Sequence, residues 1–346
     1  MHLVTGGSGF FGSLVVRDLI SQGHKVRVID TWKDRSLPSS VEFIQGDVRD
    51  RLLLKEILKD IKIVHHTAAL VPLTKSGKEF WNVNVEGTES VASCVRESKV
   101  KKMIHLSSSA VYGLPTYLPI SENTPHSPVE IYGRSKSAAE LAAIEVFRNE
   151  EDRLIIIRPR TILGEGRLGI FQTLFEWIRN DLPIYTIGNG QNLFQFIHAK
   201  DLLNAYMKII ETNGYGAYNV GTESYGTLNE LFKEIIQSAS STSRVIHLPE
   251  RTTIQALKLL DNLRLSPLAP WHYLTYHKDF YFDLTKIQAT GWRSQYSNKE
   301  MFLEAYNHYV LNSKQTLQQN ESSAHRKKVD LRALNLIRQI FRNKNV

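Results

Sequence analysis

The chain has 346 residues, 42% of them hydrophobic, which is enough for one large core or two unequal ones. Its single cysteine, Cys94, excludes an internal disulfide, and without a cysteine and histidine cluster we expect no metal. No apolar run approaches the ~18 residues of a membrane span and no signal-peptide pattern stands at the start, so we expect a cytoplasmic protein. Much of the net charge of +8 lies in residues 326–344, which argues against a nucleic-acid partner.

Short apolar runs alternate with helical stretches over residues 1–165. Strands are predicted at 2–6, 25–30, 41–47, 63–70, 103–109 and 153–159, and helices at 10–23, 52–60, 82–98 and 132–147. Repeated strand–helix–strand units require a parallel sheet with helices on both faces. The sequence therefore predicts an α/β protein with a Rossmann-type doubly wound parallel sheet.

The alternation loosens in residues 166–312, which we assign mainly to substrate binding, while parts of 190–235 are expected to complete the first domain. Thr227 with Glu230 three residues later is the pattern of a capping box at a helix start. Asp201 is expected to cap another helix. Residues 245–312 are rich in large aromatic side chains, which would line a substrate pocket or form an ordinary second core.

The C-terminal stretch divides into two parts. Residues 313–328 are polar and are predicted to form a linker. Residues 329–346 are predicted to form a basic amphipathic helical tail, with apolar side chains at helical spacing and arginines elsewhere on the wheel. This tail would lie on an anionic membrane surface as a peripheral contact, or dock on the protein's own body or on a second subunit.

A glycine-rich run, TGGSGFFG, directly follows the first predicted strand and directly precedes the first helix. Gly6 permits a tight turn, Gly9 lets backbone N–H groups approach a pyrophosphate, and Gly12 allows the helix to pack closely. The phosphates would then lie on the positive end of the helix. The flanking strand and helix favour a bound dinucleotide over an ordinary turn.

Two aspartates end the next strands. Asp30 lies a little under ~20 residues past the last glycine, where its carboxylate can accept both ribose hydroxyls of an adenosine and would repel a 2′-phosphate. This position favours NAD over NADP, the alternative being a helix cap or a turn residue. Asp47 could bond the adenine amino group, although aspartate after glycine is also common in turns.

Tyr132 and Lys136 stand four residues apart, so their side chains share one helix face. For a phenol of pKa near 10 to act as a base near pH 7, its anion needs about 4 kcal/mol of stabilisation. A cation at about 4 Å supplies about 1 kcal/mol in water and about 4 kcal/mol at an effective dielectric near 20, so the site must be closed and partly dry. Ser108 would fix a substrate hydroxyl against Tyr132, with Ser107 and Ser109 as rivals.

Taken together, TGGSGFFG, Asp30, Asp47, HTAAL, Asn84, SSSAVYG, YGRSK and RPRTILG resemble the extended short-chain dehydrogenase/reductase family, in its NAD-dependent epimerase/dehydratase branch, over roughly residues 2–310. The resemblance implies a Rossmann domain, a smaller C-terminal α/β substrate domain, tightly held NAD and commonly a homodimer. It also implies a Ser/Tyr/Lys triad that acts on a carbinol, usually of a nucleotide sugar.

The resemblance assigns residues to roles. Counting back four positions from Tyr112 gives Ser108 as the triad serine, beside Tyr132 and Lys136. Lys136 would also hold the nicotinamide ribose, and Asn84 would order the loop near the cofactor. The candidate cofactor-binding residues are Gly6, Gly9, Phe10, Phe11, Gly12, Asp30, Asp47, Val48, Ala68, Ala69, Asn84, Tyr132, Lys136 and Pro159.

Two departures from the family pattern bear on the reaction. Ser109 and Ala110 stand where sugar 4,6-dehydratases place the Asp-Glu pair that drives elimination, so dehydration is disfavoured. Phe194 and Gln195 replace an Arg-Asp pair whose arginine grips the diphosphate, a loss of about 2 kcal/mol. The basic residues that could substitute are Lys200, Lys278, Arg167 and Arg251.

Three functions are compatible with these features. The leading hypothesis is an NAD-dependent epimerase that acts on a sugar, usually nucleotide-linked, through a transient keto intermediate. The alternative is an NAD-dependent dehydrogenase of an apolar ring alcohol, similar to the 3β-hydroxysteroid dehydrogenases and sterol decarboxylases, which accounts better for Phe194 and the aromatic C-terminal region. A third reading, an NAD-binding scaffold without turnover, is disfavoured by the intact triad.

Overall fold

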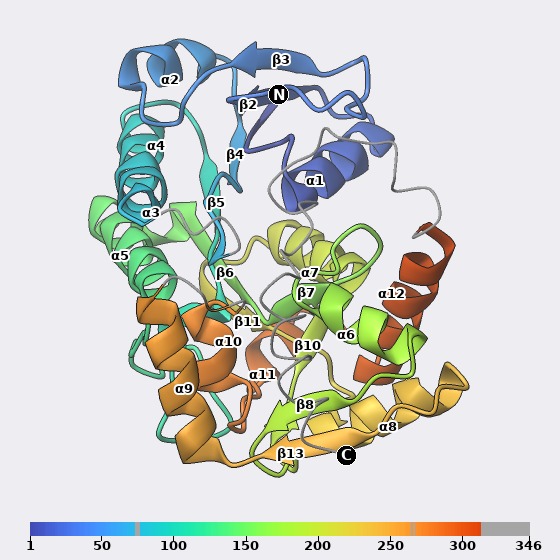
Figure 1. Ribbon diagram of the computed structural model, residues 1–346. Coiled ribbons are helices and arrows are strands. Elements are labelled where there is room, and N and C mark those ends of the chain that lie inside the picture. The colour runs from blue at the N-terminus through green and yellow to red at the C-terminus, as the bar shows by residue number, and fades with distance from the viewer. Residues whose placement is uncertain (73–76, 264–265, 267, 313–346) are drawn as a thin grey trace.

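A computed structural model describes residues 1–72, 77–263, 266 and 268–312. Its centre is a sheet of seven parallel strands in the order β3-β2-β1-β4-β5-β6-β11 (Figure 1). The strands are β1 (His2–Thr5), β2 (Val26–Asp30), β3 (Glu42–Gln45), β4 (Ile63–His66), β5 (Lys102–Leu106), β6 (Leu154–Pro159) and β11 (Gly216–Val220). The chain order reverses between β1 and β4, so the predicted doubly wound sheet is confirmed.

Helices cover both faces of this sheet. On one face lie α2, α4 and α5, and on the other α1 and α7 (Figure 1). Their bounds are α1 (Phe10–Ser21), α2 (Arg51–Ile57), α4 (Gly87–Arg96), α5 (Ile131–Val146) and α7 (Ala199–Glu211). The helix predicted over 82–98 is interrupted, because α3 (Glu79–Trp81) leads into a π-helical turn, Asn82–Glu86, before α4 begins.

A smaller α/β part lies against the carboxyl side of the sheet. It contains three two-stranded sheets, which pair β7 with β10, β8 with β13 and β9 with β12. These strands are β7 (Thr161–Leu163), β8 (Ile184–Ile187), β9 (Leu193–Phe194), β10 (Phe196–His198), β12 (Gly226–Thr227) and β13 (Val245–Leu248). Its helices are α6 (Phe171–Arg179), α8 (Leu228–Ser238), α9 (Glu250–Asn262), α10 (Pro270–Thr275), α11 (Thr285–Gln288) and α12 (Asn298–Asn312).

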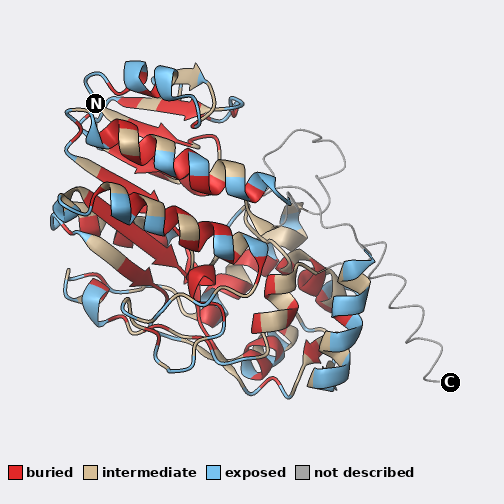
Figure 2. Ribbon diagram, turned by 90° about the vertical axis from the view of Figure 1, so that its left-hand side faces the viewer, coloured by how far each residue is buried: buried red, intermediate tan, exposed pale blue. Residues whose placement is uncertain are grey.

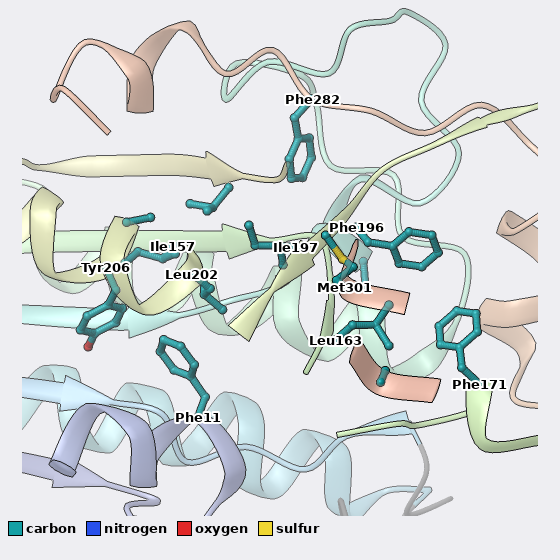
Figure 3. Packing of buried hydrophobic residues seen from close by; sticks show 14 of the residues in the cluster. Phe11, Ile157, Leu163, Phe171, Phe196, Ile197, Leu202, Tyr206, Phe282 and Met301 are labelled. Atoms are coloured by element: carbon teal, nitrogen blue, oxygen red, sulfur yellow. The ribbon is translucent and has the colours of Figure 1, made fainter. Parts of the chain in front are cut away.

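Two apolar clusters fill the interior, and the helices turn their buried faces toward the sheet (Figure 2). The smaller cluster joins α2, α4 and α5 to one face of the sheet. The larger one starts where Phe11 of α1 meets Tyr206 of α7, with ring centroids 5.5 Å apart, and continues into the smaller part through Phe196 and Met301 (Figure 3). The substrate side of the molecule is therefore packed onto the sheet through one continuous core.

Several local predictions can be compared with this fold. The capping box of Thr227 and Glu230 is present at the start of α8. The expected cap at Asp201 is wrong: His198 caps α7, and the buried Asp201 carboxylate instead accepts the backbone N–H groups of Gln295 and Tyr296. Among the described helices none is long and apolar enough to cross a membrane. The predicted linker and basic tail lie outside the described residues.

A buried ion pair fixes α5 to the sheet. The Arg158 guanidinium at the end of β6 donates to both carboxylate oxygens of Glu140 on α5. Oε2 accepts from Nη2 at 2.7 Å and from Nε at 3.0 Å, and Oε1 accepts from Nε at 3.2 Å. Both side chains are buried, and the Ser107 hydroxyl at the end of β5 donates to the same carboxylate. Arg158 also donates to the Tyr112 phenol oxygen at 2.7 Å. This network joins α5, β5 and β6 at one end of the sheet.

We expect Glu140→Ala to lower the free energy of unfolding by about 3–5 kcal/mol, because it leaves the buried Arg158 guanidinium without its counter-ion. Urea unfolding followed by circular dichroism measures the effect. The matched control is Glu145→Ala on the exposed side of the same helix, expected to change stability by less than about 0.5 kcal/mol. Equal effects of the two substitutions would contradict a special role for the buried pair.

Candidate active site

A cavity of about 390 Å³ opens at the carboxyl ends of β1, β4 and β5, next to the point where the strand order reverses. Ligands of doubly wound proteins bind at this place in the sheet. Of the predicted site residues, fourteen line this one cavity: Gly6, Gly9, Phe10, Phe11, Gly12, Asp30, Asp47, Val48, Ala68, Ala69, Ser108, Tyr132, Lys136 and Pro159. The fold therefore brings together segments that are far apart in the sequence.

The glycine loop has the geometry that its sequence predicted. Gly6 adopts a φ of +71°, and a side chain there would lie 2.6 Å from the Ala68 backbone. A Cβ on Gly12 would lie 2.3 Å from the Gly6 carbonyl oxygen, so only glycine lets α1 pack this closely. Gly9 is the N-terminal cap of α1. A Cβ added to Gly9 would have one close neighbour among the described residues, the Gly6 carbonyl oxygen at 3.1 Å. The start of α1 is thus open to an anionic group.

Asp30 stands beside the glycine loop at the end of β2. Its carboxylate accepts the backbone N–H groups of Ser8 at 3.0 Å and Thr31 at 2.8 Å, which fixes its direction. Burial raises the pKa of Asp30, and these hydrogen bonds oppose the rise. Asp47 lies farther along the same cavity and is held by Arg49, whose hydrogen bonds lower the pKa of its carboxyl.

Asn84 is the one predicted site residue that does not line the cavity. Its side chain lies in the π-helical turn, where it accepts the Leu70 N–H at 2.8 Å and donates to the Leu70 carbonyl at 3.2 Å and to the Ser135 hydroxyl at 3.0 Å. Leu70 belongs to the segment after β4 that lines the cavity. Asn84 therefore connects this segment to α5.

The three candidate catalytic residues come from two elements. Ser108 follows β5, and its hydroxyl lies near enough to the Tyr132 phenol to lower the pKa of that phenol. Glu130 caps α5 by accepting the N–H groups of Tyr132 and Gly133, so the tyrosine lies in the first turn of the helix. One turn later, the Lys136 ammonium donates to the Leu106 carbonyl at 2.7 Å.

The two rival serines are engaged by other partners. Ser107 donates to the buried Glu140 carboxylate, and Ser109 accepts a hydrogen bond from the Arg160 guanidinium at 3.1 Å. The Ser108 hydroxyl accepts the Ala110 N–H at 3.2 Å, and it is the serine hydroxyl that lowers the pKa of the Tyr132 phenol. The geometry thus favours Ser108 as the serine that meets a substrate hydroxyl.

Burial dominates the electrostatics of this site. It raises the pKa of Tyr132, while the Ser108 hydrogen bond and the positive charge of Arg167 oppose the rise. Burial also lowers the pKa of Lys136 to about 8, and the Glu140 carboxylate four residues on acts in the opposite direction. The positive charge that acts on the phenol is that of Arg167, which favours the ionised form that a base needs.

Four basic residues were predicted as possible substitutes for the missing diphosphate arginine. Of these, only Arg167 lines the cavity, with its guanidinium 5.2 Å from the centre of the Phe10 ring. Lys278 is held by Glu250 at 2.7 Å, and Lys200 lies near Glu304. A second arginine in the cavity, Arg160, was missed. It stands inside the RPRTILG motif, but only Pro159 of that motif was assigned a role, and the burial of Arg160 follows from the packing of residues distant in sequence.

His66 is the last residue of β4. Its two ring nitrogens bond the hydroxyls of Thr5 at 2.7 Å and Thr88 at 2.9 Å, so the histidine is satisfied inside the core. A second cavity of about 230 Å³, with mainly apolar walls, adjoins the first and shares Phe171, His272 and Tyr276 with it. Part of the aromatic C-terminal region therefore does line a pocket, as one of the two interpretations predicted.

Comparison with known proteins agrees with this geometry. Residues 2–221 match the family model described as NAD dependent epimerase/dehydratase family. The chain belongs to this family. The predicted enzyme class and the extended short-chain dehydrogenase/reductase fold are thereby confirmed.

Individual relatives cover most of the chain. It is 38% identical over 336 residues to the uncharacterized protein y4nG of Sinorhizobium fredii, covering 97% of this chain and 85% of the relative. It is 30% identical over 274 residues to a UDP-glucose 4-epimerase of Lactobacillus helveticus, covering 70% and 82% of the two chains. The crystal structure of a UDP-glucuronic acid 4-epimerase of Bacillus cereus with NAD has the same fold, with a TM-score of 0.72 at 21% identity, covering 90% and 98%.

The glycine loop gives a paired prediction. We expect Gly12→Ala to destabilise the protein by about 1–3 kcal/mol, because its methyl group would collide with the Gly6 carbonyl. Gly9→Ala should fold normally but bind NAD more weakly, since its methyl group would stand where the pyrophosphate approaches. Thermal unfolding and NAD titration of both variants separate the two effects. Normal NAD affinity in a folded Gly9→Ala protein would contradict this.

Proposed function

We propose that this protein is an NAD-dependent epimerase of a nucleotide sugar that works through a transient keto intermediate. The observation that carries the proposal is the position of Ser108 and Tyr132 in contact at the wall of a cavity that begins at the glycine loop. The relatives named as UDP-sugar 4-epimerases support a nucleotide sugar as the substrate and its 4-hydroxyl as the reacting group. Ser109 and Ala110 in place of an acid–base pair support epimerisation over dehydration.

Each residue of the triad has a distinct task in this proposal. Tyr132 accepts the proton of the substrate hydroxyl, and Ser108 holds that hydroxyl against the phenol oxygen. Lys136 is buried on the face of α5 that also carries Tyr132, and its ammonium would bind the nicotinamide ribose. NAD, when bound, would supply the reversible hydride transfer by which the hydroxyl is oxidised to a ketone and reduced again.

Positive charge is what makes the phenol a base here. Because burial raises the pKa of Tyr132, the proton transfer needs cations whose field is little screened by water. Arg167 and Lys136 are the cations that this chain contributes, both from the wall of the same cavity. The closed, partly dry site that the sequence argument required is consistent with a Lys136 side chain only 2% exposed.

The residues that would hold NAD follow the cavity from one end to the other. Gly6, Gly9 and Gly12 would form the pyrophosphate end, and Asp30 would bind the adenosine ribose; all four line the cavity. Asp47 and Val48 would bind the adenine, and Ala68, Ala69 and Pro159 would flank the nicotinamide. Phe10 and Phe11 complete the first turn of α1, and Asn84 supports the wall through Leu70.

The alternative, a dehydrogenase of an apolar ring alcohol, is not favoured. The apolar second cavity fits it, but the relatives whose names state an activity are UDP-sugar epimerases. Stoichiometry distinguishes the two reactions, because a net oxidation accumulates NADH whereas an epimerase regenerates its cofactor in every cycle.

Three further features belong to the proposal. Residues 1–165, completed by parts of 190–235, would form the NAD-binding domain, and residues 166–312 would form mainly the substrate-binding region. We place the protein in the cytoplasm as a homodimer. The exposed apolar side chains Leu141 and Ile144 on the outer face of α5 support a subunit contact through that helix.

The function is tested with purified, NAD-loaded protein and UDP-sugars. We expect wild-type protein to interconvert 4-epimers without steady accumulation of NADH, measured by product chromatography and absorbance in the near ultraviolet. Tyr132→Phe should lose turnover by about 100-fold or more but keep its NAD, because the substitution removes the proton acceptor alone. Equal activity in the Tyr132→Phe variant would reject the mechanism.

Cofactor choice gives another prediction. Asp30→Ala should weaken NAD binding by about 10- to 100-fold, the loss expected for hydrogen bonds to a charged acceptor, and reduce the preference over NADP. Calorimetric titration of the cofactor-free protein with both dinucleotides measures the preference. Tighter binding of NADP than NAD to the wild-type protein would contradict the role of Asp30.

A further inference from the structure

Arg160 lies between β6 and β7 and is only 1% exposed, although it lines the active-site cavity. Aromatic rings surround its guanidinium. The distance from the guanidinium carbon to the ring centre is 3.9 Å for Phe280, 4.7 Å for Phe194 and 5.8 Å for Phe282. The positive charge is therefore enclosed on several sides by apolar groups.

The hydrogen bonds of this guanidinium are incomplete. Nε donates to the Gln195 carbonyl at 2.9 Å and Nη1 to the Ser109 hydroxyl at 3.1 Å. Nη2 is buried and has no hydrogen-bond partner within the described part of the chain. No carboxylate among the described residues forms an ion pair with Arg160 either. A buried charge without a partner is costly, which makes an external counter-ion the simplest explanation.

Arg158, two residues earlier, shows what a purely structural arginine looks like in the same place. It is equally buried, but the Glu140 carboxylate neutralises it and, against the effect of burial, raises its pKa above the ordinary value. For Arg160, burial lowers the pKa to about 9, and among the described residues the Tyr276 phenol opposes this effect. The difference between the two arginines is the missing anion.

The position of Arg160 indicates which part of a substrate it meets. Nη1 bonds Ser109, the residue directly after Ser108, whose hydroxyl contacts the Tyr132 phenol. A sugar hydroxyl held between Ser108 and Tyr132 therefore brings the neighbouring ring substituent toward this arginine. In a hexopyranose with a reacting 4-hydroxyl, the neighbouring substituents are the 3-hydroxyl and the exocyclic carbon on C5, and of these only the exocyclic carbon can carry a carboxylate. The diphosphate on C1 lies across the ring.

We infer that Arg160 binds a carboxylate on the sugar ring of the substrate, next to the carbon that Tyr132 acts on, so that the substrate is a nucleotide-linked uronic acid. The inference rests on the proposed function and adds the class of sugar to it. A carboxylate matches the fork of N–H groups that Nη1 and Nη2 present. It also supplies the anion that the buried guanidinium lacks.

The test compares UDP-glucuronic acid with UDP-glucose on the NAD-loaded full-length protein. We expect wild-type protein to have at least a 10-fold higher kcat/KM for UDP-glucuronic acid. The Tyr132→Phe protein, which does not turn over, should show the same preference in binding by calorimetry. This second measurement separates recognition from chemistry.

Two substitutions assign the preference to Arg160. Arg160→Met keeps an unbranched side chain between the phenyl rings but removes the charge, and should reduce the ratio of kcat/KM for the two sugars by about 10- to 100-fold. Arg160→Lys keeps the charge without the fork of N–H groups, so it should reduce the ratio of kcat/KM for the two sugars less than Arg160→Met does. Because the guanidinium lacks a protein counter-ion, the thermal midpoint of Arg160→Met should not fall.

The outcomes separate the inference from the function. Turnover of UDP-glucose without preference for the uronic acid would overturn the inference and leave the epimerase intact. An equal loss of affinity for both sugars and for UDP alone would assign Arg160 to the diphosphate, and this would also overturn the inference. An unfolded Arg160→Met protein would assign the arginine to the fold. Absence of binding and turnover with both sugars would overturn the function and the inference together.

Discussion

The buried contact between Glu140 and Arg158 is the interaction on which the geometry of the site depends. Tyr132, Lys136 and Glu140 follow one another at intervals of four residues on α5, so the carboxylate lies on the helix face that carries the tyrosine and the lysine. Its ion pair with β6 and its hydrogen bond from Ser107 at the end of β5 determine where that face meets the sheet. Ser108, the next residue after Ser107, is thereby placed against the phenol.

The low dielectric that strengthens this contact also controls the chemistry of the cavity. Burial raises the pKa of the Tyr132 phenol and lowers the pKa of the Lys136 ammonium, so it disfavours the charged form of each group. In such an environment a cation acts strongly over a few ångströms. Arg158 has a protein carboxylate as its counter-ion, whereas Arg160 has none among the described residues, and this difference separates a structural charge from one available to a ligand.

Much of the fold could be predicted from the sequence because local patterns agree with the final structure. The strands that end at Thr5 and Asp30 and the helix that starts at Phe10 form where apolar periodicity and the glycine loop place them, whereas the strand predicted over 63–70 already ends at His66. Other features could not be foreseen. The π-helical turn at Asn82–Glu86 and the position of Asp201 inside α7, holding the 295–296 backbone, depend on contacts with distant segments.

The sequence by itself determined the doubly wound sheet, the dinucleotide loop and the pair of Tyr132 and Lys136, because each is encoded by spacing within a few residues. Only the tertiary structure decided which cations reach the cavity. Arg160 and Arg167 are neighbours of the triad through the packing of β7, β9 and the segment around Phe280, which lies far along the chain. Spacing fixes what a segment can do locally, whereas burial and the choice of counter-ions arise when distant segments exclude water together.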